Sequence, residues 1–412
     1  MTNSPPAQKP LRVLWVVNPG FGRTFSGQML VLRKLLDDWN HPGIEFSIFD
    51  PEIGKVEKCP VSRLSADSAL FQEPVHYSRQ QSLAWSIRLP FILLKYAKQY
   101  DIINLINLWW GTLLSPLVLH PLGKKVVYDM TLLGDDNPST LAASHLGKLK
   151  LALFKQFDGV TGLSPALVED CRRQQFSGQL LLQPNFLAFD PQDGDAPDLS
   201  AEVKLRLNLP VDSQVILFVG SIISRKGVDI VVEVFSHLAA RYPRLRLVLV
   251  GPNTHQENPR LDEGFVQAMK TRLVVDNLTE RVLWAGLVND SQSLSDYYRA
   301  ADIFLFPSRA EGLGNVILEA MAAGLPVVAS NLPGVTDFLI SSGEQGYLIQ
   351  PEDLSGFITA VEKLINDRDQ RQKLGTQARK TILEKFAFEN YCQTKAEFYH
   401  AVYNGQSKPE NG

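Results

Sequence analysis

Short apolar runs recur along the first half of the chain, and stretches of helical composition separate most of them. The runs cover residues 11–17, 45–49, 102–107, 125–130, 159–163 and 179–183. Near-continuous apolar runs of this length are typical of strands buried on both faces of a parallel sheet. Because helices alternate with the strands, residues 1–190 are predicted to form a doubly wound, Rossmann-like α/β domain.

The same alternation begins again after a polar stretch. Residues 189–201 are acidic and contain two prolines, so residues 191–205 are predicted to be a linker. Further apolar runs cover residues 214–219, 244–250, 281–285, 303–306, 326–329 and 346–349. They predict a second doubly wound domain over residues 206–385. An amphipathic pattern over residues 386–402 predicts a terminal helix, with a tail reaching residue 412.

The clearest unit lies between residues 303 and 330. A short apolar strand runs into a polar turn, and a helix rich in Ala, Leu and Met follows. Gly324 is expected to end this helix, because glycine readily takes the left-handed conformation required there, and Pro326 lies just beyond. Val327 then starts another buried strand, so the pattern predicts one strand-turn-helix-strand unit of a parallel sheet.

The turn of this unit has the features of an anion site. A helix N-terminus presents backbone N–H groups without helical partners, and glycines let a phosphate approach the backbone closely. The residues placed there are Glu311, Gly312, Leu313, Gly314, Asn315 and Val316.

Two glutamates flank the turn. In a continuous helix, Glu311 and Glu319 would lie about 12 Å apart along the axis. That separation fits the distance from the sugar to the ribose of a nucleotide-sugar, and both carboxylates can accept hydrogen bonds from sugar hydroxyls. The alternative is an ordinary αβ unit with two solvated glutamates, because short motifs also occur without function.

The whole string from Pro307 to Ser330 resembles the donor-site signature of the retaining glycosyltransferases of family 4, which have the GT-B fold. Glu311 and Glu319 match that family's paired-glutamate motif, and the residues on both sides match as well. The resemblance implies two Rossmann-like domains facing across a cleft, with the donor held by the second and the acceptor by the first. It also implies that the terminal helix returns to the first domain, and that Glu311 binds the donor sugar and Glu319 the ribose.

A second turn of the later domain carries two adjacent cations. Arg225 and Lys226 follow a predicted strand and precede Gly227, an arrangement that suits a diphosphate. The alternative is a solvated basic turn. The resemblance implies that Arg225 and Lys226 offset the charge that builds on the leaving nucleotide, so both are predicted to be catalytic, with Glu311. It also implies that the backbone at Leu287 pairs with the nucleobase.

The first strand of the chain ends in a glycine-bearing loop. Gly20 and Gly22, with Asp50 after the next strand, invite a dinucleotide-binding interpretation. The spacing argues against a nicotinamide or flavin site, because no third glycine stands at the fingerprint position. In the family that the chain resembles, this loop approaches the donor phosphate and the acceptor, and that is the role predicted for Gly20 and Gly22.

Asp135 and Asp136 follow a strand and could hold a divalent ion beside a diphosphate. They could equally cap the next helix or contact the acceptor, and we favour these roles. No metal and no cofactor are therefore expected. The family often has a histidine near the end of this strand, where this chain has none, which leaves the contribution of the first domain open. His120 and His145 are not assigned.

Bulk properties exclude some classes of protein. The 412 residues carry a formal charge of −3, which predicts no overall attraction to nucleic acid or to anionic lipid. The three cysteines are far apart, which suits a reducing, cytoplasmic compartment, and residues 1–10 lack the apolar core of a signal peptide.

Two stretches raise the question of a membrane. Residues 102–123 carry no charge, but their polar residues and prolines favour a buried strand, a turn and a short buried helix over a membrane span. Residues 83–98 form a mostly apolar helical pattern with aromatic side chains and three cations. Such a helix either packs under the sheet or rests on a membrane surface.

The resemblance to family 4, together with the anion-binding turns, implies a glycosyltransferase that moves a sugar from a nucleoside-diphosphate sugar to an acceptor hydroxyl with retention. It would act in glycan, polysaccharide or glycolipid synthesis. The acceptor would be a glycan or a lipid-linked molecule. The protein would make peripheral contact with a membrane through its first domain. The alternatives are a sugar-nucleotide epimerase of the same fold and a sugar-nucleotide or glycan-binding scaffold without turnover. Lys226, Glu311 and Glu319 are expected to be exposed. The sugar, base, acceptor, linkage and oligomeric state stay open.

Overall fold

The computed structural model describes residues 9–17, 27–50, 55–58, 79–191, 200–258, 261–288 and 290–406. The chain divides into two compact units. Unit 1 comprises Met1–Phe186 together with Phe388–Gly412, and unit 2 comprises Leu187–Ala387. Unit 1 therefore takes its last segment from the far end of the chain.

Unit 1 is built on a seven-stranded sheet with the order β3-β2-β1-β4-β5-β6-β7. The strands are β1 Leu11–Val16, β2 Ile44–Asp50, β3 Lys55–Lys58, β4 Ile102–Ile106, β5 Lys125–Met130, β6 Gly159–Gly162 and β7 Gln179–Leu182. The six strands predicted from the apolar runs are confirmed, and they pair in parallel. The antiparallel edge strand β3 was not predicted, because its alternating charges carry no apolar run.

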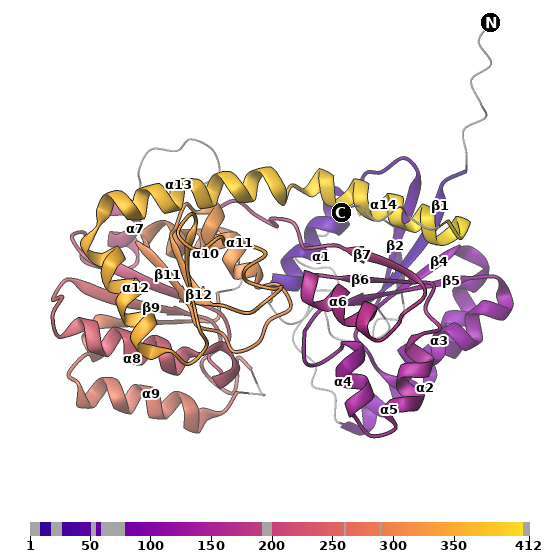
Figure 1. The fold of residues 1–412 in the computed structure, drawn as a ribbon, viewed down its shortest axis with the longest axis horizontal. Helices are drawn as coiled ribbons and strands as arrows, with labels where there is room; N and C mark the ends of the chain where they lie inside the picture. The colour runs from indigo at the N-terminus through magenta and orange to yellow at the C-terminus, as the bar shows by residue number, and fades with distance from the viewer. Residues whose placement is uncertain are drawn as a thin grey trace, which may run out of the picture. The chain divides into compact units, whose positions relative to one another are not determined.

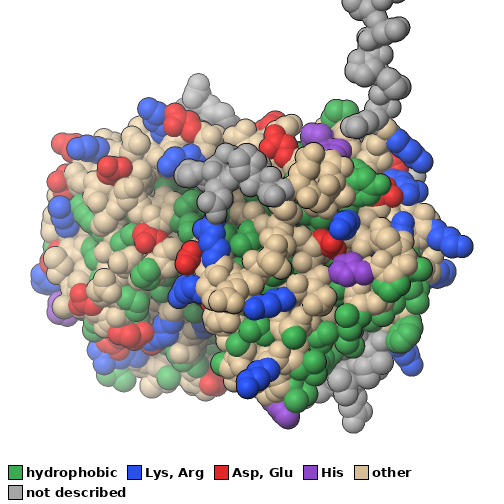
Figure 2. All heavy atoms as spheres, turned by 45° about the vertical axis from the view of Figure 1, so that its right-hand side comes forward, with side chains coloured by type: hydrophobic (Ala, Val, Ile, Leu, Met, Phe, Trp, Pro, Cys, Tyr) green, Lys and Arg blue, Asp and Glu red, His purple; other side chains and the backbone are tan. Residues whose placement is uncertain are grey.

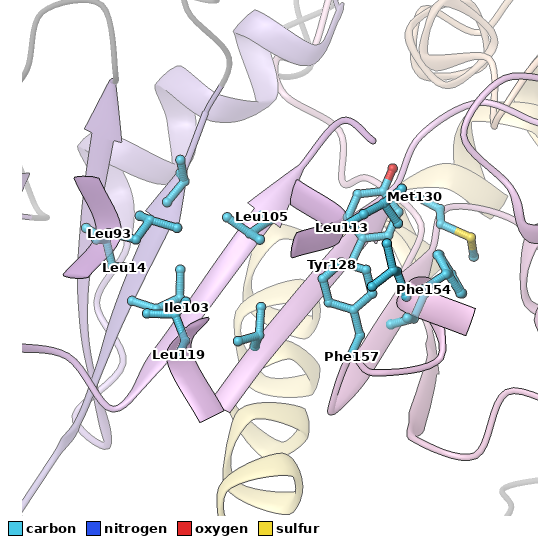
Figure 3. Close-up of a cluster of buried hydrophobic side chains, with 14 of the residues drawn as sticks. Leu14, Leu93, Ile103, Leu105, Leu113, Leu119, Tyr128, Met130, Phe154 and Phe157 are labelled. Atoms are coloured by element: carbon cyan, nitrogen blue, oxygen red, sulfur yellow. The ribbon is translucent and has the colours of Figure 1, made fainter. Parts of the chain in front are cut away.

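Helices cover both faces of this sheet (Figure 1). They are α1 Gly27–Asp38, α2 Arg79–Tyr96, α3 Trp110–Leu119, α4 Pro138–Ala143, α5 Gly147–Phe154, α6 Pro165–Arg173 and α14 Phe388–Asn404, with 3₁₀ turns η3 Ala97–Gln99 and η4 His120–Leu122. In Figure 3, apolar side chains of β4 and β5 lie among those of α2, α3 and α5. Because side chains alternate along a strand, the next residue of each strand points to the opposite face.

That opposite face of the sheet meets α14. Lys395 and Tyr399 of α14 reach Asp129 and Asn104 of the strands. The helix approaches the sheet closely, since a Cβ atom at Gly159 would lie 2.7 Å from the ring of Phe398. Only glycine therefore leaves room for α14 at this point of β6.

Unit 2 has a six-stranded parallel sheet with the order β10-β9-β8-β11-β12-β13. The strands are β8 Gln214–Val219, β9 Leu245–Val250, β10 Val282–Gly286, β11 Ile303–Phe306, β12 Val327–Ser330 and β13 Gly346–Ile349. The helices are α7 Ser200–Arg206, α8 Val228–Ala239, α9 Glu263–Val275, α10 Ser291–Ala300, α11 Asn315–Ala322, α12 Leu354–Asn366 and α13 Arg368–Lys385, with 3₁₀ turns η5 Ser224–Lys226 and η6 Thr279–Arg281. All six predicted strands are present.

The strand order of unit 2 is that of a Rossmann fold. In this fold the chain adds strands toward one edge of the sheet, then returns to the middle and adds the rest toward the other edge. The reversal falls between β8 and β11, which are hydrogen-bonded neighbours. The loops after these two strands leave toward opposite faces of the sheet. In open α/β sheets, ligands bind in the crevice at this switch point, outside the carboxyl ends of the strands.

The uncharged stretch 102–123 folds as β4, α3 and η4, and the interpretation as a buried strand and short helix is confirmed apart from exposed side chains on α3 and η4. Among the described helices, none has both the length and the apolar character needed to cross a bilayer. Most of the predicted linker, residues 192–199, lies outside the described residues.

Candidate functional site

The switch point of unit 2 brings together two residues that are 85 positions apart in sequence. Lys226 closes η5 in the loop after β8, and Glu311 lies in the loop after β11. Their side chains meet with 2.6 Å between Lys226 Nζ and Glu311 Oε1. Two of the three predicted catalytic residues are therefore direct partners, at the place where an α/β sheet binds its ligand.

The loop after β8 is fixed in place by its neighbour. The backbone N–H of Arg309 donates to the carbonyl of Arg225 over 2.8 Å. Gly227 takes a left-handed conformation at φ 70°, and a Cβ there would lie 2.0 Å from the carbonyl oxygen of Pro307. Glycine is thus required both by the backbone angle and by the closeness of the two loops. The Nζ of Lys226 also lies 5.2 Å from the centre of the Phe306 ring.

Glu311 collects several donors at once. Ser308 donates its hydroxyl to Oε1 over 2.6 Å, and the guanidinium of Arg225 lies 3.6 Å from the same oxygen. Arg225 also donates to the carbonyl of Ala310 over 2.6 Å. Glu311 is 6% exposed, so the expectation that it is exposed was wrong. Two cations and a hydroxyl take the place of water around this carboxylate, so it needs no open solvent.

Arg309 braces the same loops and was not found from the sequence. Its guanidinium makes two bonds to Asp229 of α8, at 2.9 and 2.8 Å, and two to Glu352, at 2.6 and 3.0 Å. It also donates to the carbonyl of Ser224. The hydrogen bonds to Asp229 and Glu352 raise the pKa of Arg309 above its usual value. Its position beside Ser308 offered no sequence signal, because its partners are distant in the chain.

The predicted anion site lies directly beside this pair. Gly314 caps α11 at φ 90°, and the helix begins at Asn315. Gly312, Leu313 and Gly314 are buried, whereas Asn315 and Val316 are half-buried. The first turn of α11 thus presents its positive end next to Lys226 and Arg225, which makes three sources of positive charge around one position.

Glu319 lies on α11 and is also buried, at 4% exposed, contrary to the expectation of exposure. The hydroxyl of Tyr298, on α10, donates to Oε2 of Glu319 over 2.6 Å. Burial raises the pKa of the Glu319 carboxyl to about 7, while the hydrogen bond from Tyr298 opposes this rise. Residues Ile317–Ala322 are all buried, so a glutamate among them is enclosed too. Tyr298 was missed for the same reason as Arg309.

Comparison with known protein families now bears on this geometry. Residues 201–381 match the family model described as glycosyl transferases group 1. This range holds both loops of the switch point, α11 and Tyr298. Most of unit 2 is therefore similar to a group 1 glycosyltransferase domain.

Two curated relatives are about a quarter identical to this chain over the stretches that match. The lipopolysaccharide core biosynthesis glycosyltransferase LpsE of Rhizobium meliloti is 26% identical over 293 residues, which cover 69% of this chain and 79% of that protein. The capsular polysaccharide biosynthesis glycosyltransferase CapM of Staphylococcus aureus is 26% identical over 202 residues, 49% of this chain and 48% of the relative. The match to CapM therefore spans about half of its length.

Solved structures show the same fold over nearly the whole chain. Sucrose-phosphate synthase from Thermosynechococcus elongatus has a TM-score of 0.74 at 23% identity, covering 96% of this chain and 100% of the other. HepE from Anabaena, solved in complex with UDP-glucose, has a TM-score of 0.72 at 19% identity, with 95% and 100% covered. This chain has the GT-B fold, formed by two Rossmann-like domains.

Leu287 directly follows β10 in unit 2, next to Gly286 at φ 69°. Its backbone N–H donates to Oε1 of Glu257 over 3.0 Å. Burial favours a raised pKa for Glu257, but backbone bonds from Asn253 and Leu287 lower it below the usual value. Glu257 was not predicted, and it occupies the N–H of the backbone that was expected to pair with the nucleobase. A role for Leu287 in base recognition would therefore rest on its carbonyl.

Unit 1 contributes a different kind of polar cluster. Asp136 is buried and accepts from the backbone N–H groups of Thr131 and Leu132 and from the hydroxyls of Thr131 and Tyr128. Burial raises its pKa. Asp136 thus organises the loop after β5, whereas the N-terminus of α4 is preceded by Asn137, whose side chain makes no capping bond. Asp135 is exposed.

Other predicted features of unit 1 have mixed outcomes. Gly20 and Gly22 lie outside the described residues. His120 pairs with Asp158 over 2.9 Å, at the amino-terminal end of β5 and away from the ends of the strands where ligands bind. Within the described ranges, no group of three His, Cys, Asp or Glu side chains is arranged to hold a metal ion. The absence of a metal requirement remains a prediction.

Proposed function

We propose that this glycosyltransferase moves a sugar from a nucleoside-diphosphate sugar to an acceptor hydroxyl, with retention of anomeric configuration. The observation that carries the proposal is the meeting of Lys226 and Glu311 at the β8/β11 switch point, beside the N-terminus of α11. A diphosphate is the ligand that suits two cations and a helix N-terminus at one position. The paired glutamates support retention through their resemblance to family 4.

In this proposal the main catalytic effect is stabilisation of the leaving group. As the bond between the anomeric carbon and the diphosphate oxygen breaks, negative charge grows on the diphosphate. Lys226 and Arg225 lie 2.6 and 3.6 Å from the same oxygen of Glu311, so both can act on one diphosphate. Preorganised charges aimed at developing charge commonly supply the largest single catalytic contribution. Glu311 then has two tasks, since it holds the cations in place and is proposed to contact the donor sugar.

Glu319 is assigned to the ribose of the donor. Tyr298 holds Oε2, so Oε1 is the oxygen that is left to accept a hydroxyl. The carboxylate is enclosed, and donor binding would therefore take place in a local environment of low dielectric constant, where each hydrogen bond is stronger. Gly312, Leu313, Gly314, Asn315 and Val316 are assigned to the diphosphate, and no metal is required in this scheme.

The names of the relatives guide the proposal for the pathway. LpsE is named for lipopolysaccharide core synthesis and CapM for capsular polysaccharide synthesis. We assign this chain to the synthesis of a polysaccharide or a glycolipid, with a glycan or lipid-linked acceptor bound by unit 1. The chain would act in the cytoplasm, with peripheral contact to a membrane. HepE, in complex with UDP-glucose, makes uridine donors the first to test.

Two measurements test this function. A thermal-shift panel of UDP-, GDP- and ADP-sugars should show one class that raises the melting temperature, because a ligand that binds only the folded state stabilises it. Release of free nucleoside diphosphate should then require an acceptor. Donor binding without release would favour a scaffold, and conversion of the donor sugar to an epimer would favour an epimerase. The anomeric configuration of the product, read by NMR, decides between retention and inversion.

A further inference from the structure

Three neighbouring helices of unit 1 carry large apolar side chains on their outer surface. Helix α2 packs on α3, and α3 packs on α5. Figure 2 shows hydrophobic side chains gathered on the lower part of the surface that faces the viewer. We define the α2–α3–α5 face by its exposed residues, which are Phe91, Leu94, Leu117, Leu122, Leu146 and Leu149.

The exposure is not a consequence of poor packing inside. Each helix already buries an apolar side, with Leu93 of α2, Leu113 of α3 and Leu153 of α5 in the core of unit 1. A surface helix of a soluble domain normally presents charged or polar residues on the opposite side. Here Phe91 is 65% exposed, and Leu117 and Leu149 are each 50% exposed. Large exposed apolar side chains gathered on neighbouring helices mark an interaction site.

The charged residues of the five elements that form this face have one sign. The sequences of α2, η3, α3, η4 and α5 contain no Asp or Glu. Their cations include Arg88, Lys95, Lys98 and Lys148, all exposed. The flanking carboxylates Asp101 and Asp158 are each bonded to a cation of unit 1. The whole chain has a formal charge of −3, so the positive charge is local to this face.

We propose that the α2–α3–α5 face docks onto the surface of an anionic lipid bilayer. Phe91 and the exposed leucines enter the boundary between headgroups and acyl chains, while the four cations meet anionic headgroups. This inference rests on the membrane contact of the proposed function and names the surface and the lipid chemistry that make it. A lipid-linked acceptor would then be reached from the membrane to which unit 1 is bound.

Charge complementarity selects a bilayer over a second copy of the chain. Two copies meeting through this face would bring cations against cations, with no Asp or Glu of these helices to pair them. Like charges placed opposite each other weaken an interface. An anionic bilayer supplies the missing negative charge and an apolar interior at the same time, which is the combination that the face presents.

The experiment is flotation of the purified full chain with vesicles. One set is made of equal parts phosphatidylglycerol and phosphatidylcholine, and the other of phosphatidylcholine alone. The chain should float with the first set, float much less with the second, and be released by high salt. Each cation near an anionic surface contributes roughly a fivefold increase in partitioning, so four of them make the lipid dependence large.

Two variants localise the contact. The first replaces Phe91, Leu117 and Leu149 by Ser, one residue from each helix, and should lose flotation more than tenfold. The second replaces Arg88, Lys95, Lys98 and Lys148 by Gln and should bind both vesicle sets equally weakly. The matched control replaces Leu205, Val275 and Leu383 by Ser, three exposed apolar residues of unit 2, and should float like the unaltered chain.

Several outcomes would overturn the proposal. The first is failure of the unaltered chain to float, and the second is its equal flotation with both vesicle sets. The third is flotation of the Phe91, Leu117 and Leu149 variant at the level of the unit 2 control. The unaltered chain could instead dimerise with rising concentration and bind no lipid. If only the Phe91, Leu117 and Leu149 variant abolished that dimerisation, the face would be assigned to a second copy of the chain. All variants should keep the donor-induced thermal shift. If the unaltered chain shows no donor-induced thermal shift, that result counts against the donor site and not against this surface.

Discussion

Two ion pairs, one in each unit, have a buried carboxylate and the same length but different roles. Lys226–Glu311 in unit 2 and Lys395–Asp129 in unit 1 both measure 2.6 Å between Nζ and the carboxylate. In unit 1, Asp129 also accepts from Thr161 and Asn104, and Lys395 is 3% exposed. In unit 2, Lys226 is 16% exposed, and Arg225 beside it is 38% exposed.

The difference lies in what surrounds each pair. Lys395 is the cation that neutralises Asp129, and the surrounding residues of β4, β6 and α14 complete a closed network. Around Glu311 there are two cations and a helix N-terminus, so positive charge exceeds what one carboxylate neutralises. A short buried ion pair alone therefore says little about function. An excess of charge within reach of solvent, at the switch point of a sheet, is what identifies a ligand site.

The largest effect is expected from breaking the closed pair. Lys395→Ala leaves Asp129 buried and without its cation, which typically costs about 3–5 kcal/mol. We expect the melting temperature to fall sharply, in a thermal or urea denaturation measurement. The double variant Lys395→Met with Asp129→Asn removes both charges and should regain most of the loss. If Lys395→Ala is as stable as the unaltered chain, the pair is not a structural element of unit 1.

The second effect separates function from stability in the other pair. Lys226→Ala should lower kcat about a hundredfold, because a charge on the leaving diphosphate is lost in the transition state. The fold should remain, since Arg225 and Ser308 still contact Glu311. Kinetics with the donor found in the thermal-shift panel provide the measurement. Full kcat in a folded Lys226→Ala protein would show that the diphosphate lies elsewhere.

A third, smaller effect depends on pH and concerns Glu319. Its pKa of about 7 in the folded protein exceeds that of an exposed glutamate, so the folded state binds the proton more tightly. The stability that this group contributes is fully present below its ordinary pKa of 4.5 and is lost as the pH rises to about 7. The change is about 3 kcal/mol.

The matching variant is Glu319→Gln, which cannot ionise. Its melting temperature should vary less between pH 5 and pH 8 than that of the unaltered chain. Donor affinity of the unaltered chain should weaken below pH 7, where Glu319 takes up its proton and is a poorer acceptor for a hydroxyl. Identical pH profiles for the two proteins would exclude Glu319 as the titrating group.

The smallest expected effect concerns Tyr298, which positions Glu319. Tyr298→Phe removes the hydrogen bond to Oε2 and should raise KM for the donor roughly tenfold, with little change in kcat. It should also shift the pH profile of KM upward, because the bond from Tyr298 lowers the pKa of Glu319. The adjacent Tyr297→Phe is the matched control and should leave both unchanged. Equal effects of the two variants would reduce Tyr298 to a packing role.

The sequence predicted the framework of this molecule because the relevant signals are local. Apolar runs marked the strands, and the glycines and cations after β8 and β11 marked the loops that carry Lys226 and Glu311. The burial of Glu319 was misjudged although a signal existed, since the segment around it is apolar on every side, and such helices are enclosed.

What the sequence could not predict depends on contacts between distant positions. Arg309 meets Asp229 across 80 positions, Glu257 meets Leu287 across 30, and Lys395 meets Asp129 across 266. No periodicity or short motif encodes such pairs, because they arise only when separate elements are brought together. Residues that position a site were therefore missed, whereas residues on the loops of the site were found.

The most direct test of the central claim is titration of UDP, and of GDP and ADP in parallel, into the unaltered chain and into Lys226→Ala by calorimetry. We expect one nucleoside diphosphate to bind the unaltered chain, and its affinity to fall at least tenfold in the folded Lys226→Ala protein. Equal affinity of the two proteins, or no binding of any nucleoside diphosphate, would contradict the assignment of the β8/β11 switch point as the donor site.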